Sequence, residues 1–210
     1  MARLHLLSIL LLSLVLFACD GDTRDQKAHA ESAEPLWVDV NDSSRLALGD
    51  SITDASQKTL LGNVKSAMQR GGPPEAVEYC NLQAMPLTDS LSKVYGVTIS
   101  RISERNRNPD NTPNDGVDKE ILQRYHKHFE AQQALQTRLV KGQDDQLRFY
   151  KPIFIGMPTC LKCHGDPNSD IAPATLKLLD EKYPQDEARG YKQGDLRGMW
   201  KVTFKDKKGS

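Results

Sequence analysis

The sequence Cys160-Leu161-Lys162-Cys163-His164 constrains this chain more than any other feature. It has the C-x-x-C-H spacing by which c-type haem is attached to protein. Two thiols separated by two residues can reach the two vinyl groups on one edge of a porphyrin, and the histidine that follows can bind the iron as a neutral imidazole. The fold must therefore house one covalently attached haem c, held by Cys160 and Cys163, with His164 as an axial ligand of the iron.

The motif has three other interpretations: a thioredoxin-like redox pair, half of a zinc site, and a structural disulfide. A zinc site needs two further ligands at matching spacing, and the sequence has no second C-x-x-C and no H-x-x-x-H. His126 and His128 are two residues apart on an expected helix, so they face different sides of it. A thioredoxin pair needs no histidine after the second cysteine. The haem interpretation is therefore preferred.

The N-terminus reads as an export signal that lies outside the fold. Arg3 gives a short basic start, and residues 6–17 form an apolar run that is too short to span a bilayer as a mature helix. The run ends in Leu16-Phe17-Ala18-Cys19, which resembles the lipobox of bacterial lipoproteins. Residues 1–19 are therefore predicted to be a signal peptide, with Cys19 as the lipidated residue. Ordinary signal cleavage and a retained anchor are the alternatives.

The rest of the chain divides into a tether and one domain. Residues 20–35 are rich in Asp, Ala, Glu and Lys and have almost no large apolar residue, and we predict a flexible tether over 20–40. Residues 41–206 are enough for a single domain with its own core. The net charge is zero, with 28 basic and 28 acidic side chains, and no basic patch points to nucleic acid.

Apolar periodicity and turn residues predict an α+β fold, in which N-terminal helices precede an antiparallel sheet with a helical crossover. Gly71-Gly72 separates the first two helices, and Gly96 ends the second. The predicted elements are, in order, helices over 46–70 and 73–95, a strand over 97–103, a loop over 106–116, a helix over 117–134, a hairpin of 139–140 and 147–155, a helix over 174–183 and a strand over 198–204.

Cys80 is the cysteine left over once the haem motif and Cys19 are accounted for. It lies on the apolar stripe of the second predicted helix, which comprises Ala76, Cys80, Ala84, Leu87, Leu91 and Val94 or Tyr95. Cys80 is therefore expected to point inward, either as a small core residue or as a thiolate on the iron. An open site is also conceivable, and the other candidate sixth ligands are Met68, Met85, Met157, Met199, His126 and His128.

Several motifs resemble a family of bacterial c-type haem proteins with a PAS-like fold, formerly a domain of unknown function. The similar segments, in matching order between Leu46 and Phe204, are 76–81 with Ala84 and Pro86, 101–103, 107–113, 156–165, and Tyr183-Pro184, Asp186, Ala188, Gly190-Tyr191, Gly194-Asp195 and Gly198. The resemblance implies that His164 and Cys80 form the axial pair. Ile102 and Val117-Asp118 depart from the family pattern, and neither affects these ligands.

The arginine-rich loop after the first predicted strand offers candidate cofactor-binding residues. Arg101, Arg105 and Arg107 could pair with haem propionates, since a guanidinium suits carboxylates, and Asn108 lies beside them. The alternative is that the arginines are solvated and that Asn108 builds a turn. Tyr191 and Trp200 are expected either to pack on the macrocycle or to lie in the core.

A haem with histidine and thiolate ligands has no free coordination site, which argues against an enzyme of the oxygenase or peroxidase type. It favours redox or gas sensing, in which reduction or a diatomic ligand displaces Cys80. The main alternative is a periplasmic electron-transfer cytochrome c, and a scaffold lipoprotein with a structural haem is a third. The expected location is the periplasmic side of a bacterial membrane, through the lipid anchor. Because no kinase or methyl-acceptor segment follows Phe204, a redox or signalling protein partner is expected.

Overall fold

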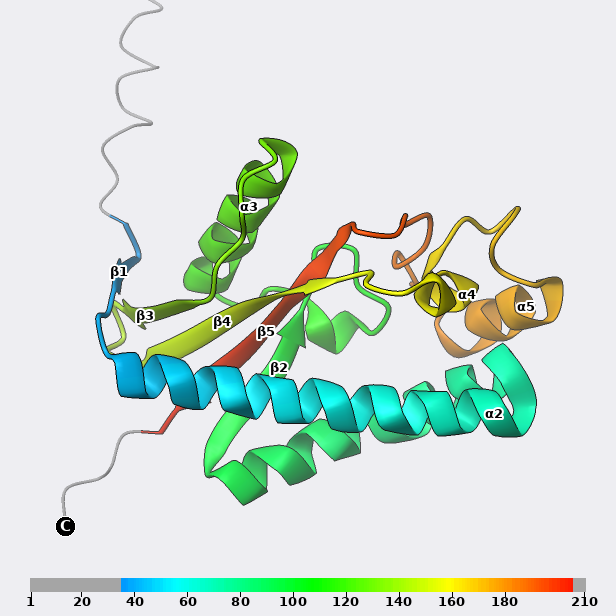
Figure 1. The fold of residues 1–210 in the computed structure, drawn as a ribbon, viewed down its shortest axis with the longest axis horizontal. Coiled ribbons are helices and arrows are strands. Elements are labelled where there is room, and N and C mark those ends of the chain that lie inside the picture. The colour runs from blue at the N-terminus through cyan, green and yellow to red at the C-terminus, as the bar shows by residue number, and fades with distance from the viewer. Residues whose placement is uncertain (1–34, 206–210) are drawn as a thin grey trace, which may run out of the picture. The chain divides into compact units, whose positions relative to one another are not determined.

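The computed structural model describes residues 35–205, so the predicted signal peptide, Cys19 and most of the predicted tether lie outside the described residues. A five-stranded antiparallel sheet has the order β1-β3-β4-β5-β2 (Figure 1). The strands are β1 (Trp37–Asp39), β2 (Val97–Ile102), β3 (Arg138–Gly142), β4 (Leu147–Phe154) and β5 (Leu196–Phe204). The helices are α2 (Ser43–Tyr95), α3 (Gly116–Glu130), α4 (Leu161–His164) and α5 (Pro173–Lys182), with 3-10 turns η1 (Pro109–Asn111) and η2 (Pro158–Cys160). The predicted α+β class is confirmed, and the arrangement is consistent with a PAS-like fold.

Strand β1 extends the folded domain into the range predicted as tether. Trp37 pairs with Gly142 and Asp39 with Val140, which makes β1 an edge strand of the sheet. The Trp37 side chain is buried in a core cluster with Val117 and other residues under α3. The domain therefore begins before residue 41, because this one aromatic side chain anchors the segment in the core.

Helix α2 is two helices joined at a corner, as the sequence predicted. Asp42 caps its start by accepting a hydrogen bond from the Arg45 backbone N–H at 3.0 Å. Gly71 and Gly72 leave the helical conformation, and Gly72 has φ +71°, which glycine adopts without strain. The chain then doubles back, and Gly96 in the left-handed conformation ends the second half (Figure 1).

The sheet has a core cluster on each face, because alternate residues of its strands point to opposite sides. Phe149 and Trp200 pack with Ile52 in the cluster that includes α2, and Tyr150 and Met199 pack in the cluster that includes α3. A side chain on Gly49 would collide with the Phe149 ring, so this glycine lets α2 lie close to the sheet.

Two predicted details are wrong. Val94 or Tyr95 was expected at the buried end of the α2 stripe, but both are exposed. The chain turns at Gly96 directly into β2, and Val97 and Ile99 fill the core there instead. Helix α3 ends at Glu130 rather than near 134, and Gln132 follows with a left-handed φ of +56°.

Within residues 35–205, no helix combines the length and the apolar composition that a membrane span requires.

Candidate functional site

A cavity of about 930 Å³ lies between the two halves of α2, the start of the loop after β2, and the segment from the end of β4 through α4. Its volume is near the upper end of the range of about 300–1,000 Å³ that holds small molecules and cofactors. The residues that line it include all of the predicted cofactor and metal ligands on the described chain: Cys80, Arg101, Arg107, Asn108, Cys160, Cys163 and His164.

His164 is prepared to bind a metal through Nε2. Its Nδ1 lies 2.8 Å from the carbonyl oxygen of Ala188, and since a carbonyl can only accept, Nδ1 carries the proton and Nε2 keeps its lone pair. Burial, helped by the positive charges of Arg107 and Arg197, holds the pKa of His164 well below its usual value. The imidazole is therefore neutral, as an axial ligand must be.

The closing segment before β5 holds the cysteine–histidine loop in place. The backbone N–H of Gly190 donates to the Gly165 carbonyl at 2.7 Å, and that of Tyr191 donates to the His164 carbonyl at 2.9 Å. The Tyr191 ring meets the His164 imidazole edge-on, with 6.4 Å between the ring centroids. Tyr191 thus packs beside the proposed ligand rather than lining the cavity.

The two cysteines of the motif are free thiols that lie among apolar side chains. Cys160 packs with Ile155 and Tyr191, and Cys163 packs with Val77 and other residues near α5. Burial raises the pKa of the Cys163 thiol to about 11. Within residues 35–205, no group of three or more His, Cys, Asp or Glu side chains is placed to hold a metal ion.

Cys80 reaches the same cavity from the second half of α2, where it is partly buried. Burial raises the pKa of its thiol, while the charges of Arg101 and Arg107 act in the opposite direction. Cys80 is therefore not simply a core residue, because its surroundings include two cations and the cavity that contains His164.

Position on the cavity lining reduces the number of candidate sixth ligands. Besides Cys80, three methionines line the cavity: Met68, Met85 and Met157. Met199 does not line it, because its side chain is fully buried in the cluster that includes α3. His126 and His128 of α3 do not line it either, and His126 Nε2 lies 3.5 Å from the carboxylate of Glu104.

Arg101 is placed to bind an anionic group in the cavity. Its Nε is buried and has no hydrogen-bond partner within residues 35–205. Its guanidinium lies 5.8 Å from the ring of Trp200, which is buried in the core and also lines the cavity. A buried Nε without a partner is costly, and the side chain borders the cavity, so Arg101 fits the predicted role of propionate partner.

The other two arginines of this loop have contacts within the protein. Arg107 lines the cavity, and Asp186 and the carbonyl groups of Cys163 and Ala188 engage its guanidinium. Arg105 does not line the cavity; its guanidinium lies 4.3 Å from the Tyr191 ring centroid.

Asn108 and Arg197 complete the polar part of the lining. The side-chain oxygen of Asn108 accepts a hydrogen bond from the Asp110 backbone N–H at 3.0 Å, so this residue builds a turn as well as lining the cavity. Sequence reasoning missed Arg197, whose Nη1 donates to Ser103 Oγ at 2.6 Å. No local pattern marked it, since an arginine near the start of a strand is most often solvated.

The charges of the cavity favour an anionic ligand. Five of its lining residues are cationic: Lys58, Lys65, Arg101, Arg107 and Arg197. Among the described residues that line the cavity, none is acidic. Most of the remaining lining is apolar, including Leu60, Val64 and Ile155. A large, mostly apolar molecule with carboxylates at one edge matches this combination, and a haem has that chemistry.

Comparison with known proteins identifies a family for this chain. The family model named Tll0287-like (Tll0287) matches residues 23–204. The chain belongs to the Tll0287-like family. A solved structure described as the cyanobacterial heme-protein Tll0287 is similar in fold, with a TM-score of 0.60 and 22% sequence identity over 80% of this chain and 99% of that chain. No curated protein matches. The predicted relationship to haem proteins is thus confirmed at the level of a family that includes one.

Proposed function

We propose that this Tll0287-like protein binds one haem c in the cavity, through thioether bonds to Cys160 and Cys163 and an axial bond from His164 Nε2. The observation that carries the proposal is the His164–Ala188 hydrogen bond of 2.8 Å, which leaves Nε2 as the only ring nitrogen able to bind a metal. The convergence of both cysteines on the same cavity supports it. So does the fold similarity to a protein described as a cyanobacterial heme-protein.

Cys80 is the second axial ligand in this proposal. It lines the cavity from the second half of α2, whereas His164 lines it from α4. Bound in this way, the haem would supply an iron that exchanges one electron and whose ferric state a thiolate favours. Arg101 would hold a propionate through its guanidinium, and the apolar side chains of α2 would keep water from the ring.

Sensing of redox state or of a diatomic gas is the function that this arrangement supports best, and we propose no enzyme activity. Cys80 belongs to a helix that runs directly into β2. The same half of α2 is tied to α5 by an ion pair of 3.3 Å between Glu78 and Lys182. A change in the bonding of Cys80 therefore has a path to the surface, where a signalling partner would read it.

Electron transfer is the second candidate, and one observation favours it. Phe154 and Met157 line the cavity and are also exposed large apolar side chains, as is Leu61. They offer an uncharged surface next to the cofactor on which a redox protein could dock.

Two measurements on the reduced protein separate these functions. A sensor binds carbon monoxide rapidly, because Cys80 can leave, and exchanges electrons slowly. A carrier exchanges electrons rapidly with a quinol or cytochrome partner and binds no carbon monoxide. If the purified protein contains no haem, both functions are excluded.

We also propose that the protein is anchored through a lipid on Cys19 at the periplasmic side of a bacterial membrane. A Cys19→Ser variant should move from the membrane fraction to the soluble periplasmic fraction while it retains its haem. A variant that stays in the membrane fraction would exclude the lipid anchor.

A further inference from the structure

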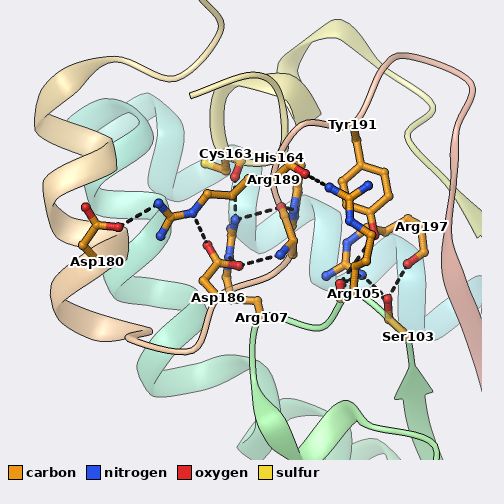
Figure 2. A network of polar contacts seen from close by, with 11 residues as sticks. Ser103, Arg105, Arg107, Cys163, His164, Asp180, Asp186, Arg189, Tyr191 and Arg197 are labelled. Carbon is orange, nitrogen blue, oxygen red and sulfur yellow. Dashed lines mark hydrogen bonds and ion pairs between the residues drawn. The ribbon is translucent and has the colours of Figure 1, made fainter. Parts of the chain in front are cut away.

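The carbonyl group of Ala188 accepts hydrogen bonds from two residues at once. His164 Nδ1 lies 2.8 Å from its oxygen, and Arg107 Nη2 lies 3.2 Å from it. Figure 2 shows this junction, with the Arg107 guanidinium directed at the Cys163–His164 loop. The proposed axial ligand and a cation thus share a single acceptor.

Arg107 is held at this junction by several contacts. Its Nη2 also donates to the Cys163 carbonyl at 2.5 Å, and its Nε lies 3.2 Å from Asp186 Oδ1 (Figure 2). The same Oδ1 accepts the Ala188 backbone N–H at 2.8 Å, and Arg189 Nε donates to Asp186 Oδ2 at 2.7 Å. The carboxylate of Asp186 therefore fixes both Arg107 and the peptide whose carbonyl Arg107 shares with His164.

We infer that Arg107 is a positioning residue that weakens electron donation by His164 through the shared Ala188 carbonyl. This inference rests on the proposed function. A carbonyl oxygen has two lone pairs, and a cationic donor on one of them withdraws electron density from the other. The carbonyl then accepts less strongly from Nδ1–H, and the imidazole is a weaker donor to the iron. Arg107 therefore raises the reduction potential above the value that the ligand pair alone would give.

The charge of Arg107 would also raise the potential, so the test needs a control variant that removes a nearby charge without touching the Ala188 carbonyl. Arg197 provides that control, because it lines the same cavity and its Nη1 donates to Ser103 Oγ and the Arg105 carbonyl rather than to Ala188 or Cys163. We expect Arg107→Gln to lower the midpoint potential of the haem-loaded protein clearly more than Arg197→Gln does. Equal shifts in the two variants, or a rise in Arg107→Gln, would overturn the inference.

A second variant keeps the test decisive if Arg107→Gln does not fold. Arg107→Lys retains the positive charge but replaces the planar fork with a single ammonium group. Its potential should fall below that of the wild type, and a wild-type potential in Arg107→Lys overturns the inference. If the wild type carries no covalent haem, the proposed function fails and the inference with it. If haem is present and only the predicted difference between variants is absent, the inference alone fails.

Discussion

Arg107 and Asp186 form an ion pair that joins the loop after β2 to the closing segment of the chain, with 3.2 Å between Arg107 Nε and Asp186 Oδ1. The Asp186 side chain is fully buried, and that of Arg107 is 12% exposed. Burial alone would raise the pKa of Asp186, but the charge of Arg107 and hydrogen bonds from Arg189 and Arg107 outweigh it, so the pKa is lowered. The carboxylate is therefore charged in the folded protein.

Replacing Asp186 should destabilise the protein in a pH-dependent way. Asp186→Ala leaves Arg107 as a buried cation without its partner, which costs about 3–5 kcal/mol in the free energy of unfolding at pH 7. Because the folded pKa lies below the unfolded value of about 3.9, the carboxylate contributes this stability above pH 4. The contribution is lost as the pH falls through the lower folded pKa. Urea unfolding of both proteins between pH 7 and pH 2.5 measures the difference, which should narrow only below pH 4.

Asp180→Ala is the matched control for this experiment. Asp180 also pairs with an arginine, Arg189, at 2.7 Å, but its side chain is exposed. An exposed pair contributes less than about 1 kcal/mol, and we expect a correspondingly small change. A loss in Asp186→Ala that is no larger than in Asp180→Ala would show that the buried pair does not hold the loop.

Covalent attachment of the haem should depend on the cysteines of the C-x-x-C-H motif and not on Cys80. Cys163→Ala removes a thioether and should abolish or severely reduce the haem retained on a denaturing gel after expression in a host that attaches haem c. Cys80→Ala should retain the haem on the same gel, because Cys80 is an axial ligand and not an attachment point. Unchanged haem staining in Cys163→Ala would exclude the proposed attachment.

Arg101→Met should change the stability of the haem-free protein and the midpoint potential of the haem-loaded protein. In the haem-free form the buried Nε of Arg101 lacks a hydrogen-bond partner, so an apolar side chain of similar length should raise the free energy of unfolding by about 1 kcal/mol. In the haem-loaded form, loss of the cation should lower the midpoint potential. Denaturant unfolding and redox titration measure the two effects. Destabilisation of the haem-free form by this substitution would contradict the assignment of Arg101 as an anion partner.

Most of the fold followed from local patterns in the sequence. Gly71-Gly72 marked the corner of α2, and the alternation of residues in β2 and β5 marked two paired strands. Strand β1 was not predicted, because its three residues are too few to show an alternating pattern. Its position depends on the tertiary packing of Trp37 in the core. Gly96 marked the end of α2 correctly. The burial of the last turn of α2 and the end of α3 were not predicted, because the turn that follows each helix, rather than helical periodicity, decides them.

The site was predictable where the chemistry fixes a spacing, as in Cys160, Cys163 and His164. The partners of these residues were not, because they depend on contacts between distant segments. No local signal connects Arg107 with Asp186 or His164 with Ala188, and the same applies to Arg197. The sequence supported a propionate role for Arg107, whereas in the fold its guanidinium is engaged with the haem-attachment loop.

The electronic absorption spectrum of the purified ferric protein, compared with that of Cys80→Ala, tests the central claim most directly. A covalent haem with His164 and a Cys80 thiolate as ligands predicts a thiolate signature in the wild type that disappears in the variant, together with a higher midpoint potential. Met85→Leu, a substitution on the same half of α2 and in the same cavity, should leave the wild-type spectrum intact. Identical spectra for the wild type and Cys80→Ala, or a wild-type spectrum without haem absorption, would contradict the account.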